Sequence, residues 1–253
     1  MSTRDIVRRV IEVFPSSHYA LLALFFGGGL ELMFAFQRLV LFVMGFFLVL
    51  VFVGVVIIRT EESEVFHPTQ IILPVMTALS TSLFALFLPV NAFIHVYIAL
   101  ATGVFFYLLK YGARQAYPTW RLIITLTVVF TTLASILGWQ YLLFGSLTLA
   151  VFLAGLAIFL LSCQLVFHSS QSPQETILVS ATVTLGLMQL LWILQFLPLQ
   201  YLAQSAIVTV VYYTIIQLVL GSYDYPVGRR EILEHLGVGG VLLGVLLSVS
   251  QWS

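Results

Sequence analysis

Ionisable side chains are rare within the apolar runs of this sequence, and the few present mark where chemistry could take place. Glu31, Arg38 and His95 are the three that fall at the depth of an expected membrane segment. A charge in hydrocarbon is costly, so such residues are candidate ion or proton sites by default. We favour an interfacial ion pair between Glu31 and Arg38. If the first helix instead continues past the glycines at 27–29, Glu31 lies inside the apolar layer and becomes a proton or cation site.

A second group of polar residues follows two tight turns of similar sequence. The tripeptide Phe-Leu-Pro occurs at 87–89 and again at 196–198. Superposing the two turns places Asn91 on Gln200 and His95 on Gln204, and these four residues form a candidate polar cluster near the outer face. The match suggests a duplicated hairpin, residues 67–110 and 172–222, in one orientation. Two unrelated tight turns would give the same pattern, because tight turns favour proline and amides at helix ends bond free backbone groups. Both interpretations therefore stay open.

Metal, cofactor and catalytic motifs are absent from the sequence. The five histidines have no ligand-like spacing, and the single cysteine, Cys163, lies inside an apolar run. The one lysine, Lys110, lies in a loop, which excludes a retinal Schiff base. There is no P-loop, dinucleotide, nucleophile-elbow or H-E-x-x-H pattern. The sequence therefore predicts no cofactor, no metal site and no catalytic residues, and it favours a protein that is not an enzyme.

The composition excludes a soluble function. Of 253 residues, 61% are hydrophobic and 8% are charged, whereas a soluble domain has about 25% charged residues. Ten basic and ten acidic residues cancel, so there is no positive field to attract nucleic acid. The chain is predicted to be a polytopic membrane protein whose first partner is the lipid bilayer.

Apolar runs of about 20 residues predict membrane helices, because backbone amides in lipid must be paired within the segment. The fold class is all-α: a transmembrane bundle of nine spans, arranged as four hairpins and a final helix. Eight spans remain an alternative. A cytoplasmic amphipathic segment at 1–15 precedes a single transmembrane domain at 16–253. Tight turns are expected at 36–37, 89–90, 138–140 and 198–200. The expected spans are 17–36, 38–58, 71–89, 91–109, 122–138, 141–166, 177–197, 201–220 and 236–251.

The placement of basic residues predicts the orientation. Nine of the ten lie on the side of the N-terminus and the longer joins, and only Arg38 lies on the tight-turn side. By the positive-inside rule, the N-terminus is cytoplasmic and, with nine spans, the C-terminus is outside. Aromatic residues on the tight-turn side fit an interfacial belt; they are Trp139, Tyr141, Tyr201 and Trp252.

Glycines in two segments suggest special packing. Gly27, Gly28 and Gly29 are either an unwound binding segment or, as we favour, the flexible end of a helix before its turn. In the last span, Gly237, Gly240, Gly244 and Ser248 recur at helical spacing. Small residues on one face let helix backbones approach closely. The partner is either another helix of the same chain or a second subunit.

Short sequence motifs resemble those of an uncharacterised multi-helix bacterial membrane family. They are Leu-Pro-Val-Met-Thr at 73–77, Thr-Val-Val-Tyr-Tyr at 209–213 and Arg-Arg-Glu-Ile-Leu-Glu at 229–234. The resemblance covers residues 70–250 and implies a bacterial inner membrane, but no activity. We therefore expect an integral membrane subunit or scaffold, which assembles with itself or another membrane subunit. The alternative is a small-solute or lipid transporter with a polar site near the outer face.

Overall fold

The computed structural model describes residues 17–35, 45, 48–56, 69–88, 92–111, 118–143, 145–167, 169, 172–224 and 229–249. Over these ranges the chain is all-α, which confirms the predicted fold class. The expected amphipathic segment at 1–15 lies outside the described residues. The nine-span count and the four-hairpin arrangement stay predictions.

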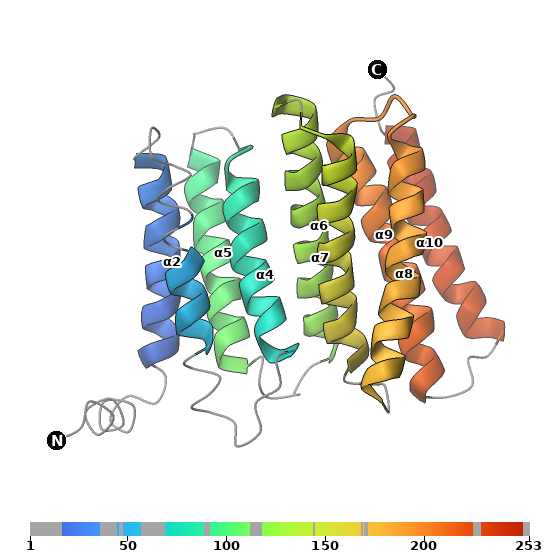
Figure 1. Ribbon diagram of the computed structural model, residues 1–253, viewed down its shortest axis with the longest axis horizontal. Coiled ribbons are helices and arrows are strands. Elements are labelled where there is room, and N and C mark those ends of the chain that lie inside the picture. The colour runs from blue at the N-terminus through green and yellow to red at the C-terminus, as the bar shows by residue number, and fades with distance from the viewer. Residues whose placement is uncertain are drawn as a thin grey trace. The chain divides into compact units, whose positions relative to one another are not determined.

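From α4 to α10 the described helices follow one another with joins of six residues or fewer, whereas α2 and α4 are separated by residues 36–68 (Figure 1). A further helical stretch covers residues 48–56. The bounds are α2 Ser17–Ala35, α4 Thr69–Ala85, α5 Ala92–Tyr111, α6 Pro118–Leu143, α7 Leu147–Phe167, α8 Pro173–Leu194, α9 Tyr201–Asp224 and α10 Arg229–Val249.

Five of the described helices are long and apolar enough to cross a membrane. They fall within α5, α6, α7, α8 and α9, with mean hydropathy between 1.7 and 2.5. Shorter apolar stretches lie in α2, α4 and α10, at His18–Phe34, Ile71–Ala85 and Leu233–Ser248. A fully apolar helix of about 20 residues matches the hydrocarbon thickness of a bilayer. These helices agree with a protein embedded in a membrane.

The predicted turn at 138–140 is wrong, because α6 continues to Leu143. One glycine inside a helix costs only about 1 kcal/mol, and Gly138 is followed by five helix-compatible residues before the join. The chain leaves the helix instead around Gly145. A Cβ added there would lie 2.8 Å from the ring of Trp139, so this position requires a glycine. At the other end, Pro118 opens α6 at the position where a proline costs no hydrogen bond.

The chain divides into two compact units, residues 1–121 and 122–253. In the first unit, α5 packs against both α2 and α4. Phe26 of α2 stacks on Phe105 of α5 with ring centroids 4.6 Å apart. Val51 and Val55, from the 48–56 helix, complete this apolar core. On the other side, the Tyr97 hydroxyl donates to the Thr81 carbonyl of α4 at 3.1 Å.

In the second unit, α8 packs between α7 and α9, and α10 packs on α9. The closest approach of α7 to α8 is at Gly155, where an added Cβ would meet the Met188 side chain. Ser172 caps α8: its Oγ accepts a hydrogen bond from the Glu175 backbone N–H at 3.2 Å. This serine and the glutamate three residues later are typical of a helix start.

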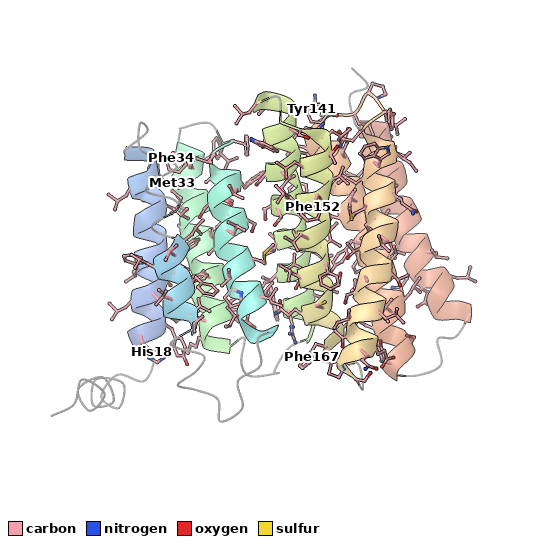
Figure 2. The ribbon with its side chains drawn as sticks, viewed as in Figure 1. His18, Met33, Phe34, Tyr141, Phe152 and Phe167 are labelled. Atoms are coloured by element: carbon pink, nitrogen blue, oxygen red, sulfur yellow. The ribbon has the colours of Figure 1, made fainter. Side chains whose placement is uncertain are left out.

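Figure 2 shows side chains filling the space within each unit. Met33 is fully buried, whereas Phe152 is 59% exposed and belongs to an apolar surface. Among the described residues, the buried polar side chains are serines, threonines and glutamines. Many of the hydroxyls donate to a carbonyl one turn back, as Thr77 does to Leu73 and Ser135 to Thr131. Such bonds satisfy the hydroxyl within its own helix.

Candidate functional site

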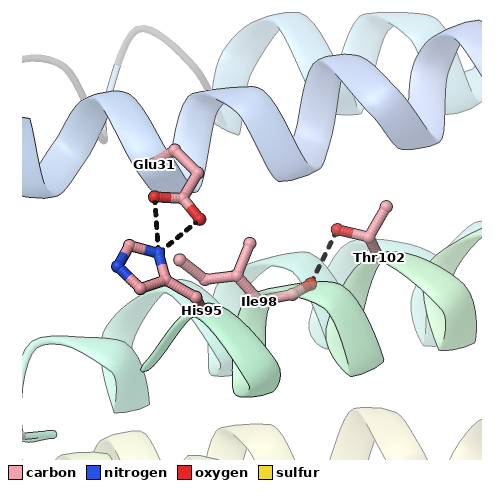
Figure 3. Close-up of polar contacts among 4 residues, drawn as sticks. All are labelled: Glu31, His95, Ile98 and Thr102. Atoms are coloured by element: carbon pink, nitrogen blue, oxygen red, sulfur yellow. Dashed lines mark hydrogen bonds and ion pairs between the residues drawn. The ribbon is translucent and has the colours of Figure 1, made fainter. Parts of the chain in front are cut away.

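Glu31 and His95 form an ionisable pair between α2 and α5. Nδ1 of His95 lies 2.9 Å from Oε1 and 3.1 Å from Oε2 of Glu31 (Figure 3). Both side chains are partly open, with 64% of the histidine and 44% of the glutamate exposed. With a proton on Nδ1, the imidazole donates to the carboxylate. The two residues are 64 positions apart, so no local sequence signal could have paired them.

The glycines at 27–29 lie inside α2, which continues to Ala35. They therefore neither unwind the helix nor end it, and both sequence interpretations are wrong for the described segment. The structure gives Gly27 a packing role: an added Cβ would meet the side chain of Thr102 on α5, while one on Gly28 would meet nothing within 4 Å. The close approach of α2 to α5 at Gly27 explains why Glu31, one turn later, reaches His95.

The expected partners of these residues are only partly described. Arg38 and Asn91 lie outside the described residues, so the predicted pair of Glu31 with Arg38 stays a prediction. Gln200 is exposed, and its backbone carbonyl accepts a hydrogen bond from the Gln204 N–H at 3.1 Å. His95 and Gln204 belong to different units. The polar cluster therefore stays a prediction as a whole.

Gln204 is the centre of a buried hydrogen-bond network in the second unit. Its Oε1 accepts from Nε2 of Gln195 at 2.9 Å. Its own Nε2 faces three acceptors: the Tyr141 hydroxyl at 2.8 Å, the Leu199 carbonyl at 3.1 Å and the Leu194 carbonyl at 3.2 Å. Two of these are carbonyls at the end of α8 and in the turn, which have no helical N–H to pair with. Gln204 therefore joins α9 to α6 and closes the end of α8.

Two partners in this network were not singled out as site residues from the sequence. Tyr141 was expected only as part of an aromatic belt, and its ring does lie 6.4 Å from that of Tyr201. Gln195 had no expected role. Both lie near the predicted tight turns, where an amide or a hydroxyl can bond the free carbonyls. That placement is the signal that could have drawn attention to them.

The small residues of α10 point away from the contact with α9. Gly237, Gly240, Gly244 and Ser248 are all exposed, and an added Cβ at any of the three glycines would meet no described atom within 4 Å. The glycine that packs within the chain is Gly239, which is buried against Thr214 of α9. The helix contact inside the chain thus uses a face adjacent to the predicted one.

Chemically, the described residues offer one exposed acid–base pair and one buried amide network. Within the described ranges, no three His, Cys, Asp or Glu side chains lie close enough to hold a metal ion. Glu31 and His95 together can hold or release a proton or attract a small polar group. The hydrogen bonds of the Gln204 side chain are made to other groups of the same chain, which fits a structural role.

One comparison with known proteins gives a match. A family model described as "Protein of unknown function (DUF5656)" matches residues 60–249. No curated protein matches the chain, and no solved structure matches it. The matched range begins after the first two predicted spans, as the sequence resemblance to an uncharacterised family suggested.

Proposed function

The chain belongs to the DUF5656 family, whose function is unknown, and from that premise we propose that it is an integral membrane subunit or scaffold without catalytic chemistry of its own. The observation that carries this proposal is how the polar interior is used. Most of the buried hydroxyls and amides of the described helices bond their own backbone or one another, as in the Gln204 network, and Thr184 is an exception. Such groups hold helices in place and are not directed at a substrate.

Assembly is proposed to occur through α10. This helix contacts α9 with the side that carries Gly239 and leaves the rest of its surface exposed. Exposed leucines and valines flank the small residues, including Leu236, Val241 and Val245. In lipid, helices associate by close backbone packing at small residues. A second membrane helix, from another copy or another subunit, would fit against Gly240 and Gly244.

The proposal is tested by native purification followed by mass analysis of the intact assembly. The wild-type chain is expected to leave the membrane with a stoichiometric partner or a second copy. Gly240→Leu with Gly244→Leu should reduce the assembly to a single chain. Gly186→Leu is the matched control, because Gly186 is also exposed on its helix with open space around it. A wild-type protein that purifies alone, or an assembly unchanged by the double substitution, would contradict the proposal.

A transporter with a polar site near the outer face is the second candidate. The Glu31–His95 pair favours it, because an ionisable pair between two helices of a membrane bundle is a common component of proton pathways. The probe is proton flux into proteoliposomes that contain a pH-sensitive dye. A transporter should give flux that Glu31→Gln removes, whereas a scaffold should give none.

The localisation proposed is a bacterial inner membrane, with nine spans and a cytoplasmic N-terminus. It is supported by the five long apolar helices and by the sequence resemblance. It is also supported by the basic residues, because nine of the ten lie on the side of the N-terminus and only one lies on the tight-turn side.

A further inference from the structure

The joins between α4 and α5 and between α8 and α9 share their length, sequence and hydrogen bonding. Residues 86–91 connect the first pair and residues 195–200 the second, and Phe-Leu-Pro occupies the same three positions in both. The Phe87 N–H donates to the Phe84 carbonyl at 3.0 Å, and the Phe196 N–H donates to the Ile193 carbonyl at 3.1 Å. The following residues, Leu88 and Leu197, repeat the same bond to Ala85 and Leu194.

The equivalence extends to the side chain one turn later. His95 is the fourth residue of α5, and Gln204 is the fourth residue of α9. Each reaches a side chain near the C-terminal end of an earlier helix in its own unit: Glu31 in α2 for His95, and Tyr141 in α6 for Gln204. Each unit therefore has one side-chain tie at this place, which we call the first tie (Glu31–His95) and the second tie (Tyr141–Gln204).

The two ties differ in chemistry and in exposure. The second tie joins an amide to a phenol; Gln204 is fully buried, and Tyr141 is 40% exposed. The first tie consists of a carboxylate and an imidazole, and both are substantially exposed. An imidazole is the side chain that changes charge around neutral pH. The first tie can therefore carry opposite charges on its two side chains, whereas the second joins an amide to a phenol.

We propose that the Glu31–His95 pair is a proton-binding site that makes the attachment of α2 to α5 depend on pH, while the second tie does not change its charge below the range in which phenols ionise, about pH 10. The imidazolium–carboxylate attraction exists only while the histidine is protonated and the glutamate is ionised. Acid removes the charge of Glu31, and alkali removes that of His95. The tie is strongest between these two limits.

Among the described residues, no other titratable group of the unit bonds the first tie; Arg38, the predicted partner of Glu31, lies outside them. The described part of α4 and the 48–56 helix, which pack in the same unit, contain none. On α5, Tyr97 directs its hydroxyl to the Thr81 carbonyl of α4. The remaining groups of α2 and α5 lie toward the opposite helix ends, about 18 Å or more along the helix axis; they are His18, Tyr19, Tyr107, Lys110 and Tyr111.

A double-mutant cycle over a range of pH tests the proposal. Glu31→Gln, His95→Gln and the double variant are unfolded by heat in detergent at acid, near-neutral and alkaline pH. We expect the coupling between the Glu31 and His95 side chains to raise the folding equilibrium constant by a factor of about two to five near neutral pH. This factor should approach one at acid and at alkaline pH. The matched cycle with Tyr141→Phe and Gln204→Leu should give a coupling that is constant across the same range.

A second measurement leaves both ties intact. Spin labels on Leu32 and Phe93 report on the first tie, and labels on Leu142 and Leu202 report on the second. All four side chains are exposed, at 52%, 79%, 55% and 39%, and the native Cys163 is replaced by serine. The first distance distribution should broaden at pH extremes and the second should stay unchanged. A first-tie coupling that is absent or constant with pH, or equal pH responses of both label pairs, would overturn the proposal.

Discussion

At the scale of the residue, Gln204 and His95 occupy matching places in their helices but differ in burial and in hydrogen bonding. Each lies one turn into a helix that follows a Phe-Leu-Pro turn. Gln204 is buried and bonds four groups of its own unit. His95 is exposed and bonds a single carboxylate. Removing a buried amide leaves its hydrogen-bond partners unpaired, which lowers the free energy of unfolding. An exposed ion pair contributes little to that free energy.

Replacing Gln204 by leucine should therefore destabilise the protein by about 1–3 kcal/mol, because it removes the partner of Tyr141, Gln195 and the Leu199 carbonyl. Thermal unfolding in detergent measures the change. Gln200→Leu is the control, because Gln200 is exposed and only its backbone is used; its effect should stay within about 0.5 kcal/mol. Equal effects of the two substitutions would refute the structural role of Gln204.

Gly27→Ala should destabilise the protein by about 1–3 kcal/mol, since the new Cβ meets Thr102 across the α2–α5 contact. Gly28→Ala should be neutral or stabilise by up to about 1 kcal/mol, because the space is open and alanine favours a helix. Chemical denaturation of the two variants compares them directly. The opposite order would mean that α2 is not a continuous helix through its glycines.

At the scale of the element, hydrophobicity decided most of what the sequence could predict. Apolar runs predicted helices that begin at residues 91 and 201. The observed helices α5 and α9 begin within one residue of these positions, at 92 and 201. The predicted turn at 138–140 is wrong because the prediction treats Gly138 as a helix break, whereas α6 continues to Leu143 and an added Cβ at Gly145, just beyond it, would meet Trp139. The Glu31–His95 pair was missed for a related reason: helix periodicity gives the face of a residue but not its distant partner.

Within α8, two threonines two residues apart should differ in how the loss of a hydroxyl changes the stability of the fold. Thr184 is 6% exposed, and its hydroxyl has no hydrogen-bond partner among the described residues. Thr184→Val should therefore stabilise the fold by about 1 kcal/mol. Thr182 is exposed and donates to the Leu178 carbonyl at 2.9 Å, so Thr182→Val should change stability by less than about 0.5 kcal/mol. Loss of stability in Thr184→Val would contradict this prediction.

At the scale of the whole molecule, the orientation in the membrane rests on the distribution of charge. From the positive-inside rule we predict that the join that contains Arg114 lies in the cytoplasm and the turn at Gln200 outside. In a Cys163→Ser background, a membrane-impermeant thiol reagent should label Gln200→Cys in intact cells. It should label Arg114→Cys only after the cells are permeabilised. The reverse pattern would invert the proposed topology.

The contact of α10 with the rest of its unit has a consequence for how the protein is made. This last helix packs on α9 through Gly239 and Thr214, while α7, α8 and α9 pack on one another without its help. During synthesis, α6 to α9 emerge from the ribosome before α10. The packing of these earlier helices can thus be complete while α10 is still being translated. For that interval the side of α9 around Thr214 is not covered by α10, and it becomes covered only when Gly239 packs against it.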